Sequence, residues 1–187
     1  AVTLVGNMIV NDGSASFRVR RLSGSTVSVT RLEFSSVVSG VFIARDEKSS
    51  GTQGGTFTSG AWRTRDLNDV RINTIVGASL ATNQITLPAG TYKTSGSAPA
   101  NQTGQHKLKL ANITDSSDVI IGSSSYMQSS LSLQTRSFID DTFTISSAKV
   151  FELQHRCNTT NATNGFGVSS SFSVVEIYSM ITIEKIG

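Results

Sequence analysis

His155 and Cys157 are the two residues whose types and spacing best suit chemistry. They lie two residues apart in an alternating run, so a β-strand would place both on one face with Phe151 and Leu153. A Ser-His-Asp hydrolase needs a histidine beside a nucleophile, and the sequence has no Gly-x-Ser-x-Gly elbow. A single cysteine excludes an internal disulfide and any zinc site with two thiolates. We therefore expect packing residues here; the alternative is a metal shared across a trimer axis.

The carboxylates form no catalytic pair either. Asp140 and Asp141 are adjacent, so on a strand they point to opposite faces and cannot flank a glycosidic bond; a turn or bulge is expected there. Asn112, Asp115 and Asp118 surround a predicted hairpin tip, where their oxygens could bind calcium, but an Asx turn explains them better. The sequence therefore predicts no catalytic residue, no resident metal and no cofactor, and the protein is expected not to be an enzyme.

Binding residues are expected in hydroxyl-rich and amide-rich loops. Serine (30) and threonine (21) together make 51 of 187 residues, so most uncharged polar surface consists of hydroxyl groups. Trp62 lies among arginines and either stacks on a sugar or is partly buried in the fold. Loops carry recognition more often than strands do, although these loops could also be plain connections. The candidate receptor-binding residues are Tyr126, Asn158, Thr160, Asn161 and Asn164.

These residues must be positioned by β-strands. Apolar residues alternate with period two, and no window shows a convincing helical repeat, which predicts an all-β fold. Four runs precede the polar, glycine-rich segment 46–55, which is expected to be a hinge. We therefore predict a small antiparallel meander over residues 1–50 and a jelly-roll β-sandwich over 51–187. The predicted strands are 2–10, 15–22, 26–34, 37–45, 61–67, 72–76, 85–87, 91–98, 106–113, 119–126, 131–145, 149–157 and 166–186.

Charge and hydropathy exclude two classes of partner. The formal net charge is only +3, because 16 Lys and Arg residues face 13 Asp and Glu residues. Arg18, Arg20 and Arg21 form the only basic cluster, which is too small for a nucleic-acid surface. No apolar run approaches the roughly 20 residues of a membrane-spanning helix. The sequence thus predicts neither nucleic-acid binding nor membrane insertion.

Several motifs also resemble a known fold family in their order along the chain. Residues 85–92 read Ile-Thr-Leu-Pro-Ala-Gly-Thr-Tyr, and they are followed by 106–110, by the long run 142–154 and by the β-branched run 176–183. This order resembles the tumour-necrosis-factor/complement-globular-head jelly roll. Ser97-Ala-Pro-Ala100, Leu153-Gln-His-Arg-Cys157 and Asn164-Gly-Phe-Gly167 are similar to a bacteriophage-borne branch of that fold, found in fibre and spike proteins. The resemblance covers roughly residues 53–187.

The resemblance implies a homotrimer on a virion surface, on the capsid or the tail. It implies adhesion to a host-surface polysaccharide, with residues 1–50 joining other virion proteins. A capsid decoration protein that binds no receptor is one alternative, and a polysaccharide depolymerase is another. By analogy with the inner sheet of the family, trimer contacts are expected from strands 91–98, 149–157 and 174–183. The interface residues expected on that basis are Tyr92, Phe151, His155, Tyr178 and Met180.

Overall fold

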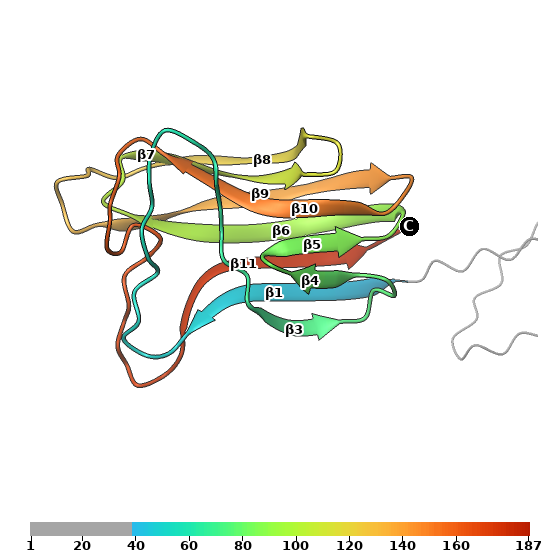
Figure 1. Ribbon diagram of the computed structural model, residues 1–187, viewed down its shortest axis with the longest axis horizontal. Coiled ribbons are helices and arrows are strands. Elements are labelled where there is room, and N and C mark those ends of the chain that lie inside the picture. The colour runs from blue at the N-terminus through green and yellow to red at the C-terminus, as the bar shows by residue number, and fades with distance from the viewer. Residues whose placement is uncertain (1–38) are drawn as a thin grey trace, which may run out of the picture. The chain divides into compact units, whose positions relative to one another are not determined.

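The computed structural model describes residues 39–187, which form two antiparallel sheets packed face to face (Figure 1). The first sheet has the strand order β3-β1-β11-β6-β9, and the second has the order β4-β5-β10-β7-β8, with the short β2 also paired to β10. In chain order the strands are β1 (Gly40–Lys48), β2 (Arg63–Thr64), β3 (Asp69–Asn73), β4 (Ser79–Ala81), β5 (Gln84–Leu87), β6 (Gly90–Asn101), β7 (Gln105–Asn112), β8 (Ser117–Tyr126), β9 (Gln134–Ile145), β10 (Lys149–Cys157) and β11 (Glu176–Lys185).

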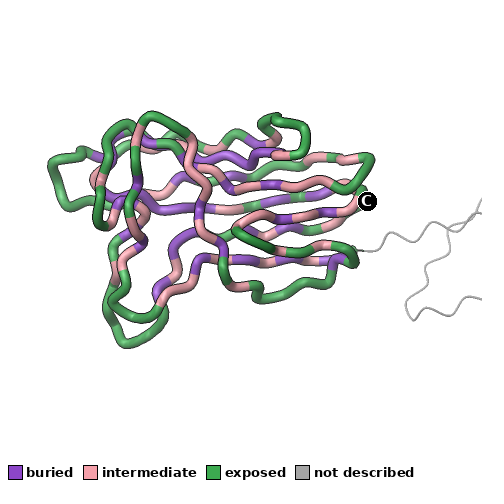
Figure 2. Tube along the Cα trace, viewed as in Figure 1, coloured by how far each residue is buried: buried purple, intermediate pink, exposed green. Residues whose placement is uncertain are grey.

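The core lies between the two sheets and follows from the alternation in the sequence. In β10 the inward residues are Phe151, Leu153, His155 and Cys157, all on one face as predicted, while Arg156 faces solvent. Figure 2 shows the same alternation of buried and less buried positions along the strands of both sheets. The all-β jelly-roll fold predicted from the sequence is therefore confirmed.

The predicted boundary at residue 50 is wrong, because β1 belongs to the sandwich. This strand lies between β3 and β11, and Phe42 and Ala44 are completely buried in the core. Segment 46–55 is not a hinge either, since Asp46 is buried within β1 and the buried Gly54 donates its N–H to the carbonyl of Gly167. The rest of the predicted N-terminal meander, and its proposed role as an anchor, lie outside the described residues.

The last predicted strand, 166–186, begins ten residues later than expected. Residues 166–175 form a loop that folds back onto the carboxylate of Glu176. Three backbone N–H groups, those of Ser170, Gly51 and Ser171, donate to this carboxylate and lower the pKa of Glu176 to about 2. The carboxylate of Glu176 thus joins the loop of Ser170 and Ser171 to the loop of Gly51, which lies 125 residues before Glu176 in the sequence.

Two strand positions also differ from the prediction. The predicted strand 91–98 stops before Pro99, because proline lacks the N–H needed for a strand ladder, but β6 continues to Asn101. Pro99 is tolerated because β6 pairs with β9 alone at this position, and its pairing with β11 ends at Ser97. Asp140 and Asp141 were expected in a turn or bulge, but both are exposed residues within the regular ladder of β9.

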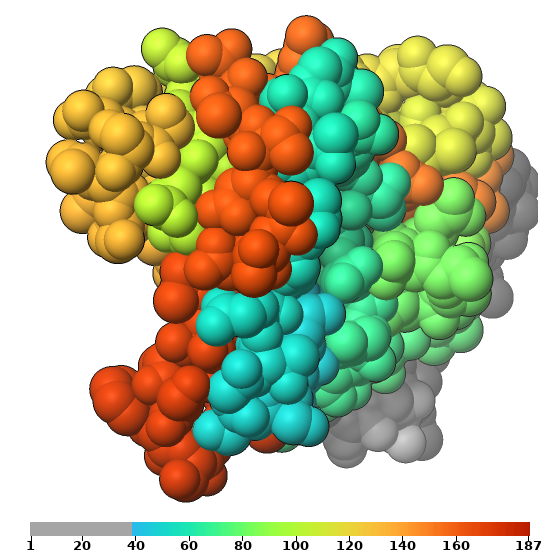
Figure 3. All heavy atoms as spheres, turned by 60° about the vertical axis from the view of Figure 1, so that its left-hand side comes forward, coloured from blue at the N-terminus to red at the C-terminus, as the bar shows by residue number. Residues whose placement is uncertain are grey.

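The two ends of the sandwich differ in character. Gly40 pairs with Lys185, so the start of β1 and the end of β11 lie at one end. Loops 49–62, 102–104, 127–133 and 158–175 gather at the opposite end, which comes forward in Figure 3. Among residues 39–187 there is no helix with the length and hydrophobicity needed to span a membrane. We call the second end the loop end, and it carries the cavity of about 510 Å³ described below.

Candidate functional site

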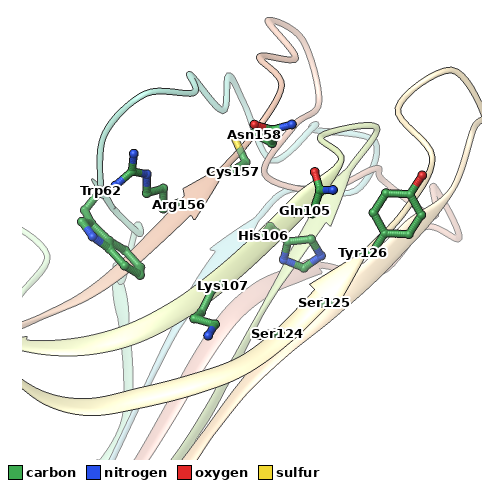
Figure 4. A pocket seen from close by; sticks show the side chains of 10 residues that line it. All are labelled: Trp62, Gln105, His106, Lys107, Ser124, Ser125, Tyr126, Arg156, Cys157 and Asn158. Atoms are coloured by element: carbon green, nitrogen blue, oxygen red, sulfur yellow. The ribbon is translucent and has the colours of Figure 1, made fainter.

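A cavity of about 510 Å³ opens at the loop end, on the outer face of the β10-β7-β8 sheet (Figure 4). Its walls come from the ends of these three strands and from the segment that precedes β2. We call it the loop-end cavity. It is lined by Trp62, Gln105, His106, Lys107, Ser124, Ser125, Tyr126, Arg156, Cys157 and Asn158.

Sheet register places a phenol and two amides in one row of the loop-end cavity. Gln105 of β7 pairs directly with Tyr126 of β8, and the backbone N–H of Asn158 donates to the carbonyl of Gln105 over 2.9 Å. Tyr126 is 61% exposed, so its ring is available to a ligand. Aromatic faces pack against the apolar face of a sugar, and amides offer both donors and acceptors to hydroxyl groups. This row therefore has the chemistry of a saccharide site.

The next row in the same sheet carries positive charge. Lys107 of β7 pairs with Arg156 of β10 on one side and with Ser124 of β8 on the other. None of the ten lining residues is Asp or Glu. Within the described part of the chain, neither Lys107 nor Arg156 forms an ion pair. The loop-end cavity therefore combines two unneutralised cations with uncharged hydrogen-bonding groups.

Trp62 closes the side of the cavity formed by β10. Trp62 is half-buried on the outer face of the sheet. This agrees with the predicted partial burial of Trp62, but its indole lies outside the sandwich core. The ammonium group of Lys109 lies 4.4 Å from the centre of the Trp62 ring and also pairs with Asp118. This contact fixes the orientation of the indole at the rim, where it leaves room for a ligand between Trp62 and Tyr126.

Two of the five predicted receptor-binding residues, Tyr126 and Asn158, meet in this cavity. The other three lie outside it because they hold the loop after β10 in shape. The side-chain amide of Asn161 donates to the side-chain oxygen of Asn164 over 2.9 Å, and the Thr160 hydroxyl accepts from the backbone N–H of Ser59. Gln105, Lys107 and Arg156 were not predicted, because only the strand register brings them beside Tyr126.

A buried histidine pair lies directly behind the cavity. His106 Nδ1 is 2.9 Å from His155 Nε2, and His106 Nε2 is 2.8 Å from the hydroxyl of Thr135. His155 Nδ1 has no hydrogen-bond partner among the described residues. We therefore place the imidazole proton of His155 on Nε2, so that the unpartnered Nδ1 is an acceptor and no buried N–H group is left without a partner. Burial, together with the charge of Arg65, lowers the pKa of His106 to about 4 and that of His155 well below its usual value.

Cys157 is a packing residue, as predicted. Its side chain is 4% exposed, and burial raises the pKa of the thiol to about 11, so the reactive thiolate is scarce at neutral pH. Among residues 39–187, no group of three or more His, Cys, Asp or Glu side chains is placed to hold a metal ion. At the β7–β8 tip the sequence favoured an Asx turn over calcium binding, and the structure has a turn there. The side-chain amide of Asn112 donates to the Asp115 carboxylate, and Lys149 pairs with that carboxylate.

The predicted trimer-interface residues are mostly wrong. Tyr92, Phe151, His155 and Tyr178 are at most 2% exposed within one copy of the chain, so they have no surface left for a neighbour. Only Met180 is accessible, at 43%. The error arises because each strand has two faces, and the sequence does not say which face is turned toward the core.

The outer face of the first sheet carries an apolar row that includes Met180. Met180 of β11 pairs with Ser97 of β6, and Ser97 pairs with Phe138 of β9, so the three side chains are neighbours across three strands. Phe138 is 55% exposed, and the three residues of the row line a depression of about 240 Å³ together with Gly96. We call this the apolar row; it lies on the opposite sheet from the loop-end cavity.

Comparisons with known proteins bear on the fold. No protein-family model and no curated protein matches the sequence. The crystal structure of murine APRIL at pH 5.0 superimposes with a TM-score of 0.51 at 7% identity, covering 79% of this chain and 98% of that one. The globular domain of zebrafish complement 1qA protein gives a TM-score of 0.48 at 10% identity, covering 80% of this chain and 96% of that one. On the strength of the APRIL superposition, the chain has the TNF/C1q-like jelly-roll fold.

Proposed function

We propose that this chain is a homotrimeric, non-enzymatic adhesion protein on a virion surface, in a fibre or spike, which binds a host-surface polysaccharide. The observation that carries the proposal is the loop-end cavity. It places Tyr126 beside two amides, and saccharides are bound by such combinations of an aromatic face with directional hydrogen bonds. The absence of carboxylates from its lining favours binding over glycosidic cleavage, which requires a pair of them.

The placement of the cavity suits an attachment protein. β1 begins at the end of the sandwich opposite the loop-end cavity, which suits a protein that is attached through residues before Gly40. The apolar row lies on the other sheet, so a trimer built on it leaves all three cavities open. Three weak sites on one rigid body gain avidity without any new contact.

Replacing Met180 with aspartate is expected to convert the trimer into monomers. A charge placed in the middle of an apolar contact loses hydration without gaining a partner, while the exposed position leaves the fold intact. Sedimentation at micromolar concentration should then give the 19.8 kDa monomer instead of a trimer. Ile121→Asp, at an exposed residue of the other sheet, is the matched control and should remain trimeric. A wild-type protein that sediments as a monomer contradicts the proposed trimer.

Replacing Tyr126 with alanine is expected to abolish adhesion to host cells while leaving the melting temperature nearly unchanged. The exposed ring contributes little to stability, but the loss of about 1 kcal/mol at each of three linked sites multiplies across the trimer. Binding of labelled protein to host cells measures the effect. Ile121→Ala, on the same strand but outside the cavity, is the control.

The same assay separates the proposal from its alternatives. Saturable binding by the wild-type protein that Tyr126→Ala removes supports adhesion. No binding at any concentration contradicts it and favours a decoration protein, and release of reducing ends from host polysaccharide would identify a depolymerase.

A further inference from the structure

We propose that the saccharide bound in the loop-end cavity is acidic, that is, that it carries a carboxylate which is held by Arg156 and Lys107. This inference rests on the proposed function for taking a saccharide as the ligand. It adds the charge of that saccharide and the residues that read it.

The loop-end cavity carries more positive than negative charge. Lys107 and Arg156 are direct cross-strand partners, and like charges in such a position repel each other unless an anion lies between them. Two other cations of the same sheet have carboxylate partners, namely Lys109 with Asp118 and Lys149 with Asp115, and the guanidinium of Arg63 donates to the carbonyls of Thr58 and Ser59. Within residues 39–187, Lys107 and Arg156 have no carboxylate partner. The missing negative charge is therefore expected from the ligand.

The loop-end cavity brings aromatic, amide and cationic side chains together around one opening. Figure 4 shows Arg156 and Trp62 on one side, Tyr126 on the other and Lys107 between them. A sugar ring that packs on Tyr126 can direct a ring substituent toward the cations. A guanidinium group binds a carboxylate through two parallel hydrogen bonds, and the ammonium group adds a point charge. Gln105 remains available to hydroxyl groups of the same sugar.

The volume and lining of the loop-end cavity favour a saccharide over a nucleic acid or inorganic phosphate. A volume of about 510 Å³ falls within the range of small-molecule sites, and one or two sugar rings fill it. A nucleic acid needs a longer track of cations than two residues supply. Inorganic phosphate would satisfy the charges but would leave the aromatic rim and the amides without a role.

The test compares acidic sugars with neutral forms of the same sugars. The probes are tetragalacturonate and 3′-sialyllactose, each paired with its fully methyl-esterified form. Binding to the full chain is measured by calorimetry or by saturation-transfer NMR. We expect at least one acid to bind about tenfold or more tightly than its neutral counterpart, and we expect this advantage to shrink as salt rises. Arg156→Gln and Lys107→Gln should each remove most of the advantage. Arg71→Gln, which removes an exposed cation from the other sheet, should leave it unchanged.

The outcomes separate this inference from the adhesion proposal. Equal affinity for acid and neutral sugar, no binding of any probe, or full competition by inorganic phosphate at the same concentration overturns the inference. Cell adhesion that resists both Arg156→Gln and Lys107→Gln also overturns it, while adhesion itself stands. Charge-dependent binding of the probes without cell adhesion supports the inference and overturns adhesion.

Discussion

A chain that begins at Ser39 is expected to fold with an intact sandwich, whereas a chain that begins at Gly51 is expected not to fold. The second truncation removes β1 from between β3 and β11, which leaves both neighbours without their shared ladder. It also removes Phe42, which is completely buried. Loss of one such phenylalanine costs about 3–5 kcal/mol, against roughly 5–15 kcal/mol for the stability of a whole domain.

Circular dichroism and urea unfolding of the two truncated chains measure this difference. The chain from Ser39 should show a β-type spectrum and one cooperative transition, and the chain from Gly51 should be aggregated or unfolded. A cooperative transition in the chain from Gly51 would contradict the assignment of β1 to the core. Because residues 40–48 serve the sandwich, only a truncation that ends before Gly40 can test whether the preceding residues attach the protein to a particle.

Mild acid is expected to destabilise the sandwich through the buried histidine pair. The folded-state pKa of His106 is about 4 and lies below the ordinary value of 6.5, because burial and the charge of Arg65 disfavour the imidazolium. Between these two values the unfolded chain binds more protons than the folded chain, so stability falls as pH falls from about 6.5 toward 4. The contribution of His106 is up to about 3 kcal/mol, and His155, whose pKa is shifted in the same direction, adds to it.

Urea unfolding at several pH values between 7 and 4 measures this loss. The double variant His106→Leu with His155→Phe removes both titrating groups and keeps the site apolar, so its stability should change little between pH 6.5 and 5. Glu176, whose pKa is about 2 against an ordinary value of 4.5, loses its contribution as the pH falls from about 5 toward 2, so the loss above pH 5 reports the histidine pair. A wild-type stability that stays constant from pH 6.5 to 4 would contradict the buried neutral pair.

The alternation of β10 shows why much of the fold was predictable. Phe151, Leu153, His155 and Cys157 alternate with polar residues, so period two alone identifies both the strand and its buried face. The same signal fails at Tyr178, which is buried near the start of β11 and whose hydroxyl donates to the carbonyl of Thr52 in the loop after β1. Local patterning thus gives a strand wherever its two faces differ in environment.

Contacts distant in sequence account for the errors. Segment 46–55 has the composition of a linker, yet β1 is fixed by pairing with β11 at the other end of the chain. Arg65 is similar: it has the sequence context of an exposed arginine but is completely buried, donates to the carbonyl of Phe166 and lies 4.0 Å from the centre of that ring. Burial without a carboxylate contact lowers the pKa of Arg65 to about 9. No local pattern encodes such a contact.

The candidate site was predictable only in part. Tyr126 and Asn158 were accessible to sequence reasoning because an aromatic residue and an amide near loops have evident binding chemistry. Lys107 and Arg156 lie near the ends of two predicted strands and are 49 residues apart in sequence, and only the strand register makes them partners. The charge of the cavity therefore emerges from pairing and not from composition, since the chain as a whole is only weakly basic.

The position of β1 also has a mechanical consequence. For a protein held from the residues before Gly40 and bound to a cell at its loop end, tension runs along the strands from one end to the other. The hydrogen bonds that join β1 to β11 and β3 lie across this direction, so they are sheared together and cannot be opened one after another. Rupture would require the whole strand to slide out of the core along with Phe42. Under such a load, the pairing of β1 with both of its neighbours would resist the pull.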